Sequence, residues 1–168
     1  MSAPATHIDA FGLLGLPPRF DVDASTLEKA FFAKSKELHP DQFQGAERVA
    51  ALGRTRALND AYQTLKKPVP RAEYLLARAG VTIGDNERLD GTFLMEILEL
   101  REELAEARAT KGDVDKLQRQ MRARRDAAVA KLEGLFAAND LAAIKEQLIV
   151  LRYLDRYLEE CDAALDED

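Results

Sequence analysis

The chain has 168 residues, of which 46% are hydrophobic and 32% are charged, and its formal net charge is −6. This length suffices for one or two small domains, and the composition is that of a helix-rich globular protein. The single cysteine, Cys161, excludes an intramolecular disulfide framework and indicates a reducing compartment. With only His7 and His39 beside it, the usual four-ligand His/Cys zinc site cannot be assembled, so no metal and no cofactor is expected.

The hydropathy and the distribution of charge restrict the partners. Residues 1–6 have neither the basic start nor the apolar stretch of a secretory signal, and no apolar run approaches the roughly 20 residues that cross a bilayer. We therefore expect a cytoplasmic protein with no membrane partner. Residues 1–80 hold 11 Lys/Arg against 9 Asp/Glu, whereas residues 81–168 hold 13 against 21. This asymmetry predicts a different partner for each half, and neither half is basic enough to make nucleic acid the main ligand.

Helical periodicity predicts an all-α chain with four helices before residue 80. The first helix is short, with a cap at Asp9 and a stop at Gly15. The second begins with a capping box at Ser25 and ends before Pro40, because the residue before a proline disfavours the α conformation. The third and fourth helices are expected at about residues 46–67 and 71–79, separated by the prolines at positions 68 and 70.

Residues 81–90 are polar and lack periodicity, so we expect a linker between a first domain of residues 1–80 and a second of residues 91–168. The second domain is predicted to hold three helices, at about residues 92–110, from an Asp113 cap to 138, and from 139 or 140 almost to the end. Their short connections predict antiparallel neighbours in a bundle. The apolar stripes of the last two helices comprise Val114, Leu117, Met121, Ala128, Leu132 and Leu135, then Leu141, Ile144, Leu148, Leu151, Leu158, Cys161 and Leu165.

The tripeptide His39-Pro40-Asp41 lies at the predicted tip of the hairpin between the second and third helices. A tripeptide of given composition arises by chance in roughly one chain in a hundred of this length, so its position is what makes it informative. One alternative is that His39 and Asp41 merely cap and turn the loop. An acid/base pair of a hydrolase is less favoured, because no Ser or Cys nucleophile and no Gly-rich oxyanion loop accompanies them. We therefore expect no enzymatic activity.

The first eighty residues resemble the J-domain family, which has a short helix, a basic second helix, a His-Pro-Asp loop and a long third helix in the same order. The resemblance implies that the loop and the basic helix face dock on a DnaK-type heat-shock chaperone and stimulate its ATPase. The chaperone-binding residues would then be His39, Pro40, Asp41, Lys29, Lys34 and Lys36. Lys29 and Lys36, seven residues apart, share a helix face. Gln42 departs from the pattern, since many J-domains have lysine there.

The helix predicted at about residues 92–110 is more apolar than one buried stripe requires. Phe93, Ile97, Leu100 and Leu104 recur at helical spacing and suffice for packing against the other two helices. The adjoining face carries an apolar cluster and then a row of carboxylates: Leu94, Met95, Leu98, Glu99, Glu102 and Glu106. This pattern predicts a docking site for a protein with a hydrophobic and basic surface. A wide core stripe with a solvated acidic edge explains it equally well.

Four runs of residues resemble the HscB family, the J-proteins of iron–sulfur cluster biogenesis. The runs are RAEYLL from Arg71, FLME from Phe93, LREEL from Leu100 and LRYLD from Leu151. The resemblance implies a J-domain followed by a three-helix bundle in an L-shaped two-domain arrangement. It also implies a co-chaperone that binds an IscU-type scaffold protein and delivers it to an HscA-type chaperone. The scaffold-binding residues would be Leu94, Met95, Leu98, Glu99, Glu102, Glu106 and, from the last helix, Tyr153.

Two other hypotheses stay open at this point. The chain is a generic J-domain protein with another client, or a helical adaptor unconnected to chaperones in which the His-Pro-Asp loop is only a turn.

Overall fold

The computed structural model describes residues 9–85 and 87–167, and it divides the chain into two compact units, Met1–Arg78 and Ala79–Asp168. Within the described ranges all regular structure is helical, which confirms the predicted all-α class. The prediction of no secretory signal at residues 1–6, together with His7, falls outside the described residues. None of the helices in the described part of the chain is long and apolar enough to span a membrane.

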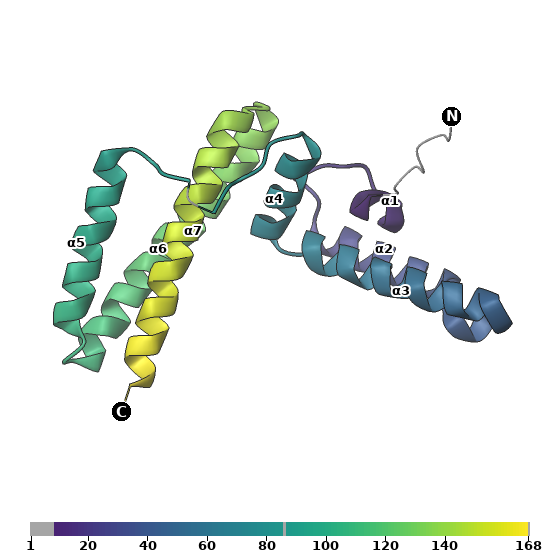
Figure 1. The fold of residues 1–168 in the computed structure, drawn as a ribbon, viewed down its shortest axis with the longest axis horizontal. Helices are drawn as coiled ribbons and strands as arrows, with labels where there is room; N and C mark the ends of the chain where they lie inside the picture. Colours follow the sequence, from purple (N-terminus) through teal and green to yellow (C-terminus); the bar gives the residue numbers. More distant parts are fainter. Residues whose placement is uncertain (1–8, 86, 168) are drawn as a thin grey trace. The chain divides into compact units, whose positions relative to one another are not determined.

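The first unit is built on an antiparallel hairpin. Figure 1 shows α2 (Ala24–Glu37) and α3 (Gly45–Leu65) side by side, joined through the 3-10 turn η1 (Pro40–Gln42). The short helix α1 (Ala10–Leu14) packs against both helices of the hairpin, and α4 (Pro68–Arg78) packs against α3. The hairpin therefore holds its connecting loop at the end of two long, mutually supporting helices.

The core of the first unit joins all four of its α-helices. The ring of Phe31 on α2 stacks on that of Tyr62 on α3, with centroids 4.4 Å apart. On α4, the hydroxyl of Tyr74 accepts a hydrogen bond of 2.8 Å from the backbone N–H of Ala10, which ties α4 to α1. The buried residues at the centre are Ala10, Phe11, Leu14, Leu27, Leu58, Ala61 and Leu65. Burial of this apolar surface stabilises the hairpin far more than helix propensity alone.

Several helix starts differ from the prediction. The cap of α2 is Asp23 rather than Ser25, because Asp23 has the extended backbone of a cap and its carboxylate accepts a 2.7 Å hydrogen bond from the N–H of Thr26. Helix α4 begins at Pro68, since prolines fit the first turn, where no intrahelical N–H bond is required. The predicted cap Asp113 instead lies within the first turn of α6, where its charge favours the helix dipole.

The second unit is a bundle of α5 (Gly91–Ala107), α6 (Lys111–Ala137) and α7 (Leu141–Asp166), shown in Figure 1. Helices α6 and α7 pack along most of their lengths, and α5 lies against both. The buried face of α7 is wider than the predicted stripe, because α7 contacts both other helices. It includes Ile144, Leu148, Ile149, Leu151, Leu154, Tyr157, Cys161 and Ala164, whereas Leu141, Leu158 and Leu165 are only half-buried.

Two contacts fix the register of α5 against α7. Near the start of α5, the ring of Phe93 meets the ring of Tyr153 edge-on, with centroids 5.7 Å apart. At its end, the guanidinium of Arg108 pairs with Glu167 at 2.9 Å. Because both contacts join residues at nearly the same separation in sequence, α5 and α7 run in the same direction. Helix α5 therefore lies beside the middle and the end of α7.

Candidate functional site

The His-Pro-Asp loop is a tight turn whose backbone groups form hydrogen bonds within the loop. Pro40 occupies the first position of η1, which suits its fixed backbone angle. Nδ1 of His39 accepts a hydrogen bond of 3.2 Å from the backbone N–H of Asp41. The carbonyls of His39 and Pro40 accept hydrogen bonds from the N–H groups of Gln42 and Phe43, at 3.0 and 3.1 Å. The loop thus has a defined conformation without any partner.

Side chains also anchor this loop to both helices of the hairpin. Gln42 donates from Nε2 to the carbonyl of Lys36 at 2.6 Å, near the end of α2. On α3, Thr55 donates from Oγ1 to the carbonyl of Leu38 at 3.2 Å. Gln42, which stands where the resemblance to J-domains implies a lysine, therefore contributes a hydrogen bond to the loop instead of a positive charge.

The functional groups of the loop remain accessible. The side chains of His39 and Asp41 are 57% and 74% exposed, and Nδ1 of His39 lies 3.6 Å from Oδ2 of Asp41. Arg48 on α3 reaches Oδ1 of Asp41 only at 3.7 Å, with its own side chain 58% exposed. An ion pair that is this long and this exposed contributes little stability. The carboxylate of Asp41 is therefore free to exchange this weak contact for a stronger one.

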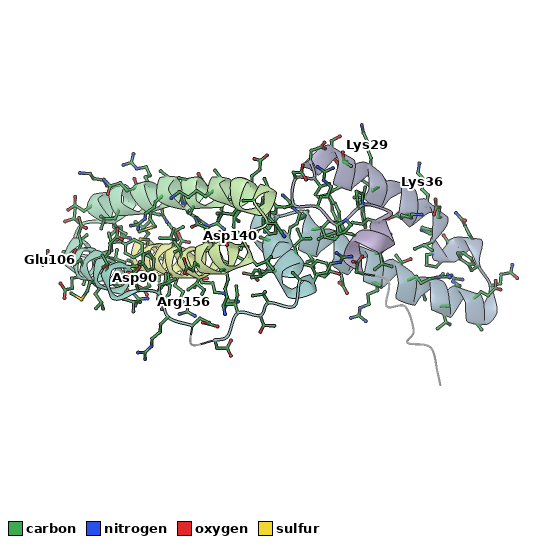
Figure 2. All side chains as sticks on the ribbon, turned by 90° about the horizontal axis from the view of Figure 1, so that it is seen from above. Lys29, Lys36, Asp90, Glu106, Asp140 and Arg156 are labelled. Carbon is green, nitrogen blue, oxygen red and sulfur yellow. The ribbon has the colours of Figure 1, made fainter. Side chains whose placement is uncertain are left out.

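The predicted basic face of α2 holds two of its three lysines. Figure 2 shows Lys29 and Lys36 pointing outward from α2 on the same side. The spacing of Lys29, Phe32 and Lys36 places all three on one stripe of the helix, and Phe32 is 56% exposed. Lys34 lies elsewhere, because it is half-buried and its Nζ pairs with Glu37 at 3.1 Å. Phe32 was not among the predicted site residues, although its position between two lysines of one stripe is a signal in the sequence that indicates it.

The outer face of α5 carries two stripes. Leu94 and Leu98 share one stripe with Arg101, whose guanidinium pairs with Glu160 of α7 at 3.1 Å, so this stripe borders α7. The second stripe is directed further outward and comprises Met95, Glu99, Glu102 and Glu106, all of them exposed. Met95 is 58% exposed and Leu98 is 53% exposed, and the two lie on adjoining stripes, so they form a patch and not scattered single residues.

Tyr153 continues this surface from α5 onto α7. The edge contact with Phe93 places its half-buried ring next to α5, and the guanidinium of Arg156 lies over the ring at 6.0 Å. Phe93, expected only in the core, is half-buried and also lies 6.0 Å from the guanidinium of Arg124 on α6. The structure therefore places all seven predicted scaffold-binding residues on one side of the bundle. Glu96 lies on the other side of α5, where the ion pair with Arg124 lowers its pKa.

Comparison with known proteins decides the family. The family model of the DnaJ domain matches residues 9–74, and the model described as the HSCB C-terminal oligomerisation domain matches residues 89–162. A co-chaperone protein HscB homolog of Burkholderia thailandensis is 37% identical over 164 residues, which cover 93% of each chain. The chain belongs to the HscB family of J-domain co-chaperones.

Solved HscB structures have the same fold. Chaperone HscB from Vibrio cholerae is 34% identical, with a TM-score of 0.78 over 94% of this chain and 98% of that one. Human co-chaperone protein HscB is 28% identical, with a TM-score of 0.84 over 97% of this chain and 85% of that one. The predicted J-domain followed by a helical carboxyl-terminal domain is thus confirmed. The roles of individual residues in the HscB-type site stay predictions.

Proposed function

We propose that this protein stimulates the ATPase of a DnaK/HscA-type chaperone and delivers an IscU-type scaffold protein to it during iron–sulfur cluster assembly. Membership of the HscB family supports the co-chaperone role. The observation that carries the proposal is the His-Pro-Asp loop, whose backbone is bonded while its functional side chains are exposed. In this role the protein brings two partners together and has no catalytic chemistry of its own.

The loop is suited to act as a preformed contact. Because Nδ1 of His39 is occupied by the N–H of Asp41, the other ring nitrogen of His39 is left for the chaperone. The carboxylate of Asp41 offers charge-assisted hydrogen bonds, which are stronger than neutral ones. Since the turn is already ordered by its bonds to Lys36 and Leu38, binding costs little conformational entropy.

The lysines of α2 extend this contact. Lys29 and Lys36 are exposed on one stripe, so they would attract an acidic chaperone surface and raise the rate of association. Lys34 has its charge engaged by Glu37 and its side chain half-buried, so we expect the smallest contribution from it. Phe32 lies between the two exposed lysines and would add apolar contact at the centre of the same face.

The bundle offers a separate surface for the scaffold. Leu94, Met95, Leu98 and Tyr153 provide the apolar centre, and the carboxylates of Glu99, Glu102 and Glu106 form an acidic edge. Exposed apolar side chains bordered by charged groups are typical of protein–protein interfaces. The exposure of Met95 and Leu98 favours docking over the alternative of a wide buried stripe, because more than half of each side chain stays exposed.

The chaperone part of the proposal is tested by steady-state ATP hydrolysis of the cognate chaperone as the protein is added. Asp41→Asn removes the exposed charge of the loop, and we expect it to abolish most of the stimulation. Asp60→Asn is the matched control, since Asp60 is an exposed aspartate of the same unit on α3. Equal stimulation by the Asp41→Asn and Asp60→Asn variants would show that the loop does not act on the chaperone.

The basic face is tested with charge reversals in the same assay. Lys29→Glu and Lys36→Glu should each raise the concentration needed for half-maximal stimulation by roughly three- to tenfold at low salt, and less at high salt. Lys67→Glu, an exposed lysine between α3 and α4, is the control and should leave that concentration nearly unchanged. Equal effects at all three lysines would mean that only the net charge of the protein matters.

A further inference from the structure

Next to Tyr153, a polar groove runs between α7 and the segment that precedes α5. It is lined by Arg88 and Ile83 of the segment and by Ile149, Arg152, Tyr153 and Arg156 of α7. Arg152 donates a long hydrogen bond of 3.4 Å to the carbonyl of Gly84, which attaches the segment to the helix. The groove therefore brings three guanidinium groups to the edge of the surface proposed to bind the scaffold.

These three arginines differ from the other arginines of the bundle. Among residues 79–85 and 87–167, six arginines form salt bridges with carboxylates: Arg101, Arg108, Arg119, Arg122, Arg124 and Arg125. In the same described part of the unit, Arg88, Arg152 and Arg156 form no salt bridge, and all three line this groove. In a unit with 21 acidic and 13 basic residues, three arginines left without a carboxylate partner at one place are unexpected.

The carboxylates of the groove neutralise the guanidinium groups only in part. Glu87 forms a salt bridge of 2.8 Å with Lys145, and that lysine, the N–H of Gly84 and the charge of Arg152 lower the pKa of Glu87. Asp85 is the other acidic residue in the lining. Three guanidiniums thus share the groove with one carboxylate that has no cationic partner of its own. The lining therefore has an excess of positive charge, with three guanidinium groups against two carboxylates, although the unit around it is negative.

The proposed scaffold-binding surface differs in charge from one side to the other. Its outermost stripe on α5 carries Glu99, Glu102 and Glu106, the stripe nearer α7 carries Leu94 and Leu98, and Tyr153 comes next. Beyond the ring of Tyr153 lie Arg156 and the groove. Figure 2 shows Glu106 on α5 and Arg156 on α7 projecting outward from the bundle. The apolar centre therefore has carboxylates on one side and guanidiniums on the other.

We infer that the groove of Arg88, Arg152 and Arg156 binds acidic side chains of the scaffold protein, and so fixes the direction in which the scaffold docks. This inference rests on the proposed function and adds a second, oppositely charged contact to it. Guanidinium groups bind carboxylates through two parallel hydrogen bonds, so they specify geometry as well as charge. A partner with basic groups at one end and acidic groups at the other would dock in one orientation, since the reverse orientation places like charges together.

The experiment measures the association rate constant of the purified scaffold with the full-length protein at several salt concentrations. Arg156→Glu should slow association by about tenfold at low salt, and the effect should shrink as salt screens the charges. Arg156→Lys keeps the charge but not the paired hydrogen bonds, so it should retain the salt dependence and lose affinity by a few fold. Arg119→Glu is the control, because Arg119 is an exposed arginine of α6 outside the groove.

Charge-swap variants identify the partner group. Substituting lysine in turn for each acidic residue on the scaffold surface should reveal at least one change that restores binding to the Arg156→Glu variant. Equal rates for Arg156→Glu and Arg119→Glu, or the absence of any restoring scaffold change, would overturn the inference.

Leu98→Ala separates this inference from the function on which it rests. If Leu98→Ala weakens scaffold binding while Arg156→Glu does not, the inference about the groove is wrong and the proposed function stands. If the unmodified protein does not bind the scaffold at all, the proposed function fails, and the groove inference fails with it.

Discussion

Leu98 and Leu104 form a natural pair for testing the outer face of α5. Both are leucines on the same helix, but Leu98 is 53% exposed and Leu104 is 2% exposed. If Leu98 contacts the scaffold, Leu98→Ala should weaken binding and leave folding almost unchanged. Leu104→Ala should do the reverse, because it removes buried methyl groups from the bundle core and leaves a cavity.

The magnitudes follow from the exposed fractions. Burying a whole leucine side chain contributes about 1.5–3 kcal/mol, so covering the exposed half of Leu98 contributes about 0.8–1.6 kcal/mol to binding. This corresponds to an increase of about four- to fifteenfold in the Kd of the scaffold for the Leu98→Ala variant. Its free energy of unfolding should fall by less than about 1 kcal/mol. For Leu104→Ala the expected loss of unfolding free energy is about 2–5 kcal/mol.

Isothermal titration calorimetry with the purified scaffold gives the Kd, and urea denaturation followed by circular dichroism gives the free energy of unfolding. Leu98→Ala should change mainly the Kd, and Leu104→Ala should change mainly the free energy of unfolding. If Leu98→Ala binds the scaffold as tightly as the unmodified protein, the outer face of α5 is not the scaffold site. If it unfolds as easily as Leu104→Ala, the face is part of the core.

Three further predictions concern charge and burial. The N–H of Gly12 and the guanidinium of Arg78 lower the pKa of Asp9 in the folded protein. Above pH 3.8, the Asp9→Asn variant should therefore unfold at a lower urea concentration than the unmodified protein. This difference should vanish as the pH falls through the pKa that Asp9 has in the folded protein. Arg71 is buried, lies over the ring of Phe20 and donates a hydrogen bond to the carbonyl of Leu65. Arg71→Ala should therefore lower the free energy of unfolding by about 2–4 kcal/mol. Arg71→Met keeps the apolar stem, so it should lower the free energy of unfolding by less. Burial raises the pKa of the Cys161 thiol to about 11, so a thiol reagent at about pH 8 should modify it only after unfolding; rapid labelling of the native protein would refute this.

The helices and the His-Pro-Asp loop could be predicted from the sequence, because local signals determine them. Prolines, glycines and apolar spacing marked each helix, and His39-Pro40-Asp41 stood between two of them. The exact capping residues of the helices were harder to predict. Asp23 and Ser25 are both good capping residues only two positions apart, and the backbone conformation that decides between them depends on how α2 is packed.

Features that depend on contacts between helices could not be predicted. The wide buried face of α7, which includes Leu154, arises because two helices pack on it, and no spacing within α7 indicates that width. The register of α5 against α7 puts Phe93 beside Tyr153, whereas the three-residue spacing on α7 already puts Arg156 next to that ring. No local pattern places Ile83 and Arg88 against α7, so the groove became visible only in three dimensions.

The co-chaperone function is tested most directly by single-turnover ATP hydrolysis of the cognate chaperone, with this protein added in the presence and in the absence of the scaffold. We expect the protein alone to accelerate hydrolysis, the scaffold to increase the acceleration, and His39→Gln to abolish it under both conditions. Acceleration without any effect of the scaffold would contradict the proposed client. No acceleration at all would contradict the co-chaperone function and reduce the His-Pro-Asp loop to a turn between helices.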